Sequence, residues 1–138
     1  MLSGEYMTNT PGVITSPEFP ENYPEDLDLT THVTVEKGKI IRLEFNVFAV
    51  YPGYGGSTCL YNFVRITDGD GTTLMGNRCG YFDPPVIMTK TNKVDVYFRS
   101  IDAPRKGRAR RWRLSWTTVE GGNCYHYIIS VSELTTKN

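Results

Sequence analysis

The sequence has few of the residues on which metal and hydrolase sites depend. Its 138 residues contain two histidines, His32 and His126, and three cysteines, with no close pair among them. Zinc ligands usually come as close pairs, so a zinc site is not expected. Neither histidine stands in a Ser/His/Asp or Cys/His arrangement that spacing suggests, and His32 alternates with strand residues as a surface residue does. We therefore expect no catalytic residue, no metal ion and no cofactor.

Long apolar runs and a net charge are missing as well. No apolar stretch approaches the roughly 18 residues of a membrane span, and the first ten residues lack the apolar core of a signal peptide. We expect that any secretion signal was removed or left out. No Asn-X-Ser/Thr sequon is present, so glycosylation adds no support for secretion. Fifteen basic residues balance fifteen acidic ones, which argues against a nucleic-acid partner.

Short strand patterns are present in place of helical ones. The clearest alternation covers Lys39–Val47, where Ile41, Leu43, Phe45 and Val47 share one face. Aromatic residues make up 12% of the chain, which favours β structure. The other predicted strands are Gly12–Thr15, Thr30–Glu36, Leu60–Ile66, Val86–Thr89, Val94–Arg99 and Arg111–Val119. At least seven short strands separated by turn residues predict an all-β fold, an antiparallel β-sandwich of two sheets.

The length predicts one domain. We place it at residues 1–120, with residues 1–11 as an irregular lead-in that makes one edge pairing at most. Gly121-Gly122 then interrupts the chain. Residues 121–138 are expected to form a C-terminal extension or an edge strand, because Tyr125–Val131 is β-prone but follows the last core strand.

The stretch from Cys59 to Gly80 predicts a strand, a tight turn at Asp68-Gly69, a short return strand and a disulfide between Cys59 and Cys79. A disulfide implies an oxidising compartment, whereas three unrelated thiols would fit a cytosolic protein. The third cysteine, Cys124, either links two chains into a disulfide-bonded dimer or remains a free thiol.

The order of these segments resembles that of the CUB domain family over about residues 1–119. The matching segments are Gly12–Pro24, Ile41–Phe48, Cys59–Ile66, the Asp68-Gly69 turn, Cys79-Gly80, Pro84–Ile87, Val96–Ser100 and Trp112–Trp116. The resemblance implies an extracellular two-sheet sandwich of jelly-roll type. It also implies a binding module of a larger secreted or membrane protein, and not an enzyme.

Two features of the family are missing at the matching positions. The family's first disulfide would join positions near Leu2 and Leu29, and both cysteines are absent. Many CUB domains hold calcium through acidic residues, which would fall near Tyr51, at Asn62 and at Ile101, with Asp102 one place out of register. Calcium needs several oxygen ligands, carboxylates foremost, so we expect no calcium site.

The loops that border the calcium site in the family supply the candidate partner-binding residues. They are Tyr51, Tyr54, Asn62 and Asp102, because exposed tyrosines make good contact residues. Tyr61 belongs to the same region, and packing of its side chain in the core is an equal alternative. From these residues we predict recognition of another extracellular protein or receptor through the end loops of the sandwich.

The segment Arg105–Arg113 carries six positive charges in nine residues. Its candidate anion-binding residues are Arg105, Lys106, Arg108, Arg110 and Arg111. Clustered arginines bind sulfated glycosaminoglycans or acidic surfaces, which is the alternative function. Arg108–Arg111 also resembles a furin-type cleavage sequence, and a solvated surface is the simplest interpretation. A third possibility is a regulatory exosite domain of a secreted protease.

Overall fold

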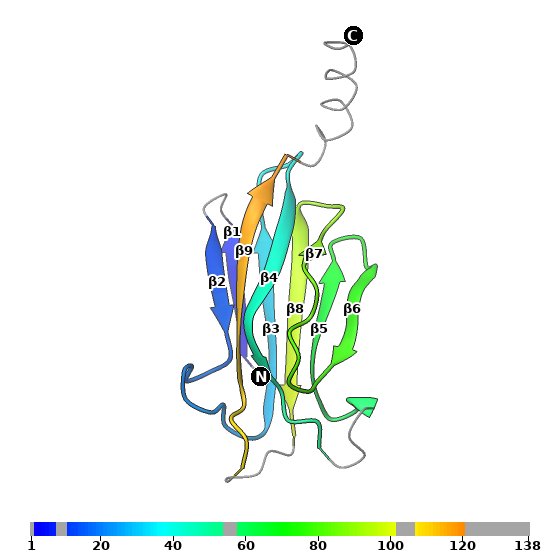
Figure 1. Cartoon of the computed structure of the whole chain (residues 1–138). Coiled ribbons are helices and arrows are strands. Elements are labelled where there is room, and N and C mark those ends of the chain that lie inside the picture. Colours follow the sequence, from blue (N-terminus) through cyan, green and yellow to red (C-terminus); the bar gives the residue numbers. More distant parts are fainter. Residues whose placement is uncertain (1, 8–10, 54–57, 102–106, 121–138) are drawn as a thin grey trace, which may run out of the picture.

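A computed structural model of the chain shows two β-sheets packed face to face, with no α-helix among the described residues (Figure 1). It describes residues 11–53, 58–101 and 107–120, together with the backbone of residues 2–7. In these ranges no helix is long and apolar enough to cross a membrane. The strands are β1 (Leu2–Met7), β2 (Gly12–Thr15), β3 (Leu27–Thr34), β4 (Ile40–Ala49), β5 (Asn62–Asp68), β6 (Thr73–Arg78), β7 (Ile87–Met88), β8 (Lys93–Ser100) and β9 (Arg111–Val119).

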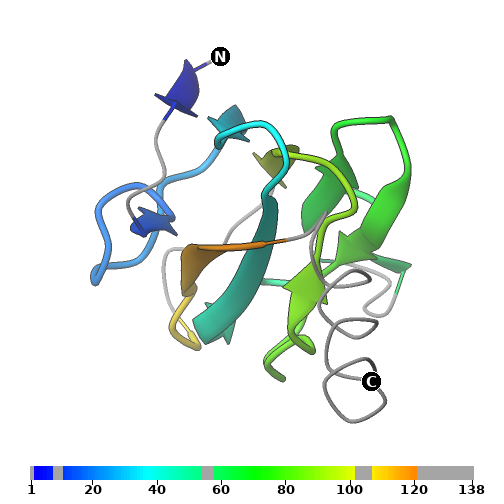
Figure 2. The ribbon, with the colours of Figure 1, turned by 90° about the horizontal axis from the view of Figure 1, so that it is seen from above.

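One sheet has five strands in the order β1-β3-β8-β5-β6, and the other has four in the order β2-β9-β4-β7. Seen from above in Figure 2, the two sheets form two layers. The predicted all-β sandwich is therefore confirmed, and all its strand pairs but one are antiparallel. The exception is β1, which pairs with β3 in parallel. The lead-in thus makes the one edge pairing that the sequence analysis allowed, and it does so as a six-residue strand.

The core lies between the sheets and consists of the residues that alternate inward along each strand. Trp112, Leu114 and Trp116 of β9, which the alternation places on one face, are exposed by 2%, 0% and 1%. They face Phe98 of β8, whose ring meets the Trp112 ring edge to face with centroids 5.4 Å apart. Burial of these large rings is the main source of stability for a sandwich without helices.

The alternation in β4 breaks at a β-bulge. Phe45 pairs with Leu114 and Val47 with Arg113, so Asn46 is the extra residue between them. An extra residue in one strand moves all the following side chains to the opposite face. Phe48 is consequently buried and Val47 only partly so. The prediction that Val47 shares the inner face was wrong for this reason.

Asp68 has a larger role than its predicted place in a hairpin turn. It ends β5, and its carboxylate is 1% exposed. Its oxygens accept hydrogen bonds from Lys90 N–H at 2.7 Å, Gly69 N–H at 2.7 Å and the Thr91 hydroxyl at 2.6 Å. The carboxylate therefore ties the β5–β6 turn to the segment that enters β8.

The last strand, β9, ends at Val119, close to the predicted domain boundary at residue 120. Residues 121–138, including Cys124, His126 and the β-prone stretch Tyr125–Val131, lie outside the described residues. The predicted boundary and the nature of the extension therefore stay predictions.

Candidate functional site

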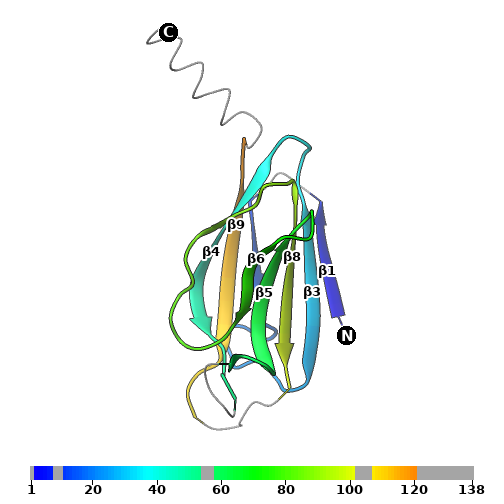
Figure 3. The same ribbon diagram turned by 90° about the vertical axis from the view of Figure 1, so that its right-hand side faces the viewer.

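Three loops meet at the end of the sandwich that is drawn at the bottom of Figures 1 and 3. Their described residues are 16–26, then 50–53 with 58–61, and 101 with 107–110, and the segment 79–83 lies beside them through the antiparallel pair Val50–Gly80. Backbone hydrogen bonds join the first and third loops, since Tyr23 N–H donates to the Arg110 carbonyl at 3.1 Å. We call this end, with its three loops and the segment 79–83, the loop end.

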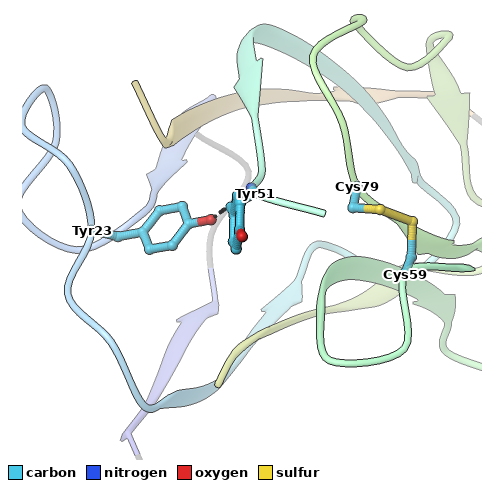
Figure 4. Close-up of a disulfide and its surroundings, with 4 residues drawn as sticks. All are labelled: Tyr23, Tyr51, Cys59 and Cys79. Carbon is cyan, nitrogen blue, oxygen red and sulfur yellow. Dashed lines mark hydrogen bonds between the residues drawn. A yellow bond between two sulfur atoms is a disulfide. The ribbon is translucent and has the colours of Figure 1, made fainter. Parts of the chain in front are cut away.

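Tyr23 holds the first two loops together from inside. Its side chain is fully buried, and its ring meets Phe98 edge to face with centroids 4.9 Å apart. Its hydroxyl oxygen accepts a hydrogen bond from the Tyr51 backbone N–H at 3.0 Å (Figure 4). Burial raises the pKa of the Tyr23 phenol to about 12, so the group stays neutral at physiological pH.

The disulfide between Cys59 and Cys79 anchors the second loop beside this contact (Figure 4). It connects the residues just before β5 and just after β6, with the two Cα atoms 5.5 Å apart. Next to it, Val50 and Gly80 exchange two backbone hydrogen bonds of 2.9 and 2.8 Å. One disulfide and two backbone hydrogen bonds therefore restrain the base of the loop end.

Asn62, a predicted partner-binding residue, lies inside the loop end. Its side chain is fully buried, and its Oδ1 accepts a hydrogen bond from the Ile101 N–H at 2.9 Å. A Cβ atom on Gly53 would lie 2.9 Å from Asn62 Nδ2, which shows how closely the second loop packs on this amide. Asn62 therefore joins the second and third loops from within. Of the other candidates, Tyr51 is partly exposed, and Tyr54 and Asp102 lie outside the described residues.

The described residues at the expected calcium positions do not fit a calcium ion. Tyr51, Asn62 and Ile101 supply no carboxylate, and the Asn62 carbonyl oxygen already accepts the Ile101 hydrogen bond. Across the described ranges, no group of three or more His, Cys, Asp or Glu residues could hold a metal ion. Calcium takes six to eight oxygen ligands, so these neutral groups alone do not make a site.

The described residues of the basic segment do not form one surface. Arg105 and Lys106 lie outside the described residues. Arg108 is exposed, and its guanidinium carbon stands 3.9 Å from the centroid of the Tyr81 ring. Arg111, three residues further along the chain at the start of β9, donates from Nη1 to the Pro20 carbonyl at 2.8 Å.

Arg110, the third described member of this segment, points inward. It is 8% exposed, donates from Nε to the Tyr23 carbonyl at 3.0 Å and stands 5.5 Å from the Tyr23 ring centroid. Trp112, which follows the furin-like sequence, is 2% exposed. A protease reads its substrate in an extended, accessible form, so cleavage after Arg111 would require local unfolding.

Four exposed apolar side chains mark the surface of the loop end. Phe82 is exposed by 86%, Leu60 by 58%, Tyr61 by 51% and Ile101 by 38%. Tyr61 thus does not pack in the core, which was the alternative at this position. Leu60, Phe82 and Ile101 are not among the partner-binding residues that the sequence predicted. The sequence signal that could have identified them is an apolar residue just outside a strand. Leu60 follows Cys59, Phe82 follows Tyr81, and Ile101 follows the last residue of β8.

The chain is similar in sequence to known proteins. A model of the CUB domain matches residues 3–115. Rat cubilin is 35% identical over 100 residues, which cover 72% of this chain and 3% of cubilin. Mouse mannan-binding lectin serine protease 1 is 31% identical over 122 residues, which cover 88% of this chain and 16% of the protease. The chain therefore spans a small part of the curated relatives that it matches.

Solved structures agree with these matches. The crystal structure of the MASP-1 CUB2 domain bound to Ca2+ superposes with a TM-score of 0.71 at 28% identity, covering 83% of this chain and 96% of that domain. The full extracellular region of zebrafish Gpr126/Adgrg6 contains a similar fold, with a TM-score of 0.62 at 21% identity over 83% of this chain and 14% of that one.

Proposed function

The chain belongs to the CUB domain family, and on this premise we propose that it is a non-catalytic extracellular module that recognises another protein through its loop end. The Cys59–Cys79 disulfide supports an oxidising compartment. The relatives support a module of a larger secreted protein or of the ectodomain of a membrane protein.

The observation that supports this proposal is a group of exposed apolar side chains at the loop end, next to loop residues that are held in place. Leu60, Tyr61, Phe82 and Ile101 expose apolar surface beside loops that Tyr23 and the disulfide hold in place. Burying one such side chain against a partner contributes about 1.5–3 kcal/mol. Because the disulfide and the Tyr23 hydrogen bond already hold the described parts of these loops, little of this gain is lost to ordering those parts on binding.

The test compares matched pairs of exposed apolar residues. The loop-end variant Leu60→Ser/Tyr61→Ser and the control Val13→Ser/Met88→Ser, whose residues are exposed by 37% and 41%, are screened against purified extracellular proteins. We expect a partner of the wild-type domain to lose at least about tenfold in affinity for the loop-end variant and to bind the control unchanged. Equal binding to both variants would exclude the loop end as the recognition surface.

A sulfated glycan is the second candidate ligand, through the basic segment. Arg108 is exposed and has no carboxylate partner among the residues that the structure describes. The test is elution from immobilised heparin at rising salt, where a glycan contact weakens steeply because bound cations are screened. Arg108→Gln/Arg111→Gln should elute at lower salt than the control Arg42→Gln. Elution of the wild type, the double variant and the control at the same salt concentration would refute the glycan contact.

Two further proposals concern the larger assembly. Similarity to mouse mannan-binding lectin serine protease 1, and to mouse complement C1r-B subcomponent at 44% identity over 97 residues, fits a regulatory or exosite domain of a secreted protease. The C1r-B match covers 64% of this chain and 13% of that protein. We also propose that Cys124 links two chains. A dimer on non-reducing gels that disappears in Cys124→Ser supports this link, and a monomer excludes it.

A further inference from the structure

The outer face of the five-stranded sheet contains a shallow groove that is separate from the loop end. Strands β3, β8 and β5 lie side by side, and their register sets Thr30 opposite Tyr97 and Tyr97 opposite Arg65. Asp95 lies opposite Thr67 in the same way. These five residues line a groove of about 330 Å³. All five side chains alternate with core residues, so they face away from the sandwich interior.

Arg65 is held in one place at this groove. Its guanidinium carbon lies 5.0 Å from the centroid of the Tyr97 ring and 5.5 Å from that of Phe63. Its Nη1 donates to Asn77 Oδ1 at 3.1 Å. Phe63 belongs to the outer face of the sheet, since it alternates with core residue Val64, yet it is only 3% exposed. The arginine is therefore preorganised by two rings and an amide.

The groove combines a positive and a negative group. Arg65 has no carboxylate partner in the part of the chain that the structure describes, so its charge is available to a ligand. Asp95 is fixed by His32, whose Nδ1 lies 2.5 Å from Asp95 Oδ1, which leaves the second carboxylate oxygen without a described partner. Thr30 and Thr67 contribute hydroxyl groups from the two strands that flank β8, with Thr30 opposite Tyr97 and Thr67 opposite Asp95.

We propose that this groove binds one acidic sugar unit, of the uronic or sialic acid type. The carboxylate of the sugar pairs with the Arg65 guanidinium group. The sugar hydroxyl groups donate hydrogen bonds to Asp95 and exchange them with Thr30 and Thr67. The Tyr97 ring offers an apolar surface for the sugar ring. A sulfate ion fits less well, because it has no hydroxyl donor for Asp95. The groove volume suits a small ligand of this size.

The test is a titration of the isotope-labelled domain, followed by amide chemical shifts. Methyl glucuronide and methyl glucoside differ only in the carboxylate, so they form a matched pair of probes, and the methyl glycoside of sialic acid is a second acidic probe. We expect an acidic sugar to shift the resonances of β3, β5 and β8 and to bind at least about tenfold more tightly than the glucoside. Equal binding of glucuronide and glucoside, or no saturable shift in these strands, would overturn the proposal. So would equal binding of acetate, which would show that charge alone is recognised.

Variants locate the site on the sheet. Arg65→Gln should weaken glucuronide binding at least about tenfold, whereas Arg42→Gln, on the outer face of the other sheet, should leave it unchanged. Thr67→Val keeps the volume and removes one hydroxyl, so it tests the groove if Arg65→Gln unfolds. Unchanged binding in both groove variants refutes the site. Leu60→Ser/Tyr61→Ser should bind the sugar normally, so failure here and failure of the loop-end proposal are distinguishable.

Discussion

Leu2 and Leu29 lie directly opposite each other as Cα partners in the parallel pair of β1 with β3. The sequence comparison with the CUB family placed the two absent cysteines of the first disulfide near these same positions. The register of the two strands thus agrees with the alignment. It indicates that β1 keeps by backbone pairing the position that a covalent bridge fixes elsewhere in the family.

We predict that Leu2→Cys/Leu29→Cys forms a disulfide, because opposed residues of paired strands lie within the Cα separation that a disulfide spans. Closing this loop should raise the free energy of unfolding by about 3–4 kcal/mol. Thiol titration and thermal unfolding with and without reductant measure both effects in a Cys124→Ser background. The offset pair Leu2→Cys/Thr31→Cys is the control, and equal oxidation of that pair would contradict the register.

Because of Tyr23, the free energy of unfolding of the domain should fall at alkaline pH. Its pKa rises from 10.0 to about 12 on folding, mainly through burial, so between these values the unfolded chain ionises while the folded chain stays protonated. This contribution to stability is complete below pH 10 and is lost as the pH rises through 12. The loss amounts to about 2–3 kcal/mol.

Tyr23→Phe isolates this effect, because it keeps the ring and removes the titrating group. Urea unfolding at a series of alkaline pH values should show a shallower decline in the variant than in the wild type. At neutral pH the variant should lose about 1 kcal/mol, because the Tyr51 N–H loses its acceptor. Parallel declines in the two proteins would rule out Tyr23 as the source.

Asp68→Asn should lower the free energy of unfolding by about 1–3 kcal/mol. The amide retains the shape of the carboxylate, but its NH2 group replaces one oxygen and cannot accept the hydrogen bonds made to it. The lost bonds are either the one from Lys90 N–H to Oδ2 or those from the Gly69 N–H and the Thr91 hydroxyl to Oδ1. Asp70→Asn is a matched control in the same turn, since Asp70 is exposed and accepts a backbone hydrogen bond from Thr72 at 2.9 Å. Its cost should stay within about 0.5 kcal/mol. Denaturant unfolding of both variants measures the difference, and equal losses would contradict the role of Asp68.

Addition of calcium should not change the thermal stability of the domain. Chelator-treated protein is expected to show the same melting temperature before and after calcium addition, because Tyr51, Asn62 and Ile101 supply no carboxylate to the ion. Calorimetric titration provides an independent measurement. Tight binding with a rise in melting temperature would show that another carboxylate, such as Asp102, completes a calcium site at the loop end.

Local sequence patterns predicted most of the strands and of the core residues, although not the β-bulge in β4. Alternation along Arg111–Val119 correctly placed Trp112, Leu114 and Trp116 in the interior, because a strand sends every second side chain to the same face whatever its neighbours are. Turn residues separated the strands for equally local reasons. The all-β class followed from these short-range rules, and the family resemblance added the order of the strands.

Local patterns did not predict which polar and apolar residues remain accessible. Asn62 and Arg110 carry binding chemistry in the sequence but are buried, because Ile101 and Tyr23 from distant segments supply their partners. Leu60 and Tyr61 are exposed, although their types suit a core. Exposure depends on which segments pack together across the sandwich, and residue type and spacing along the chain do not contain that information.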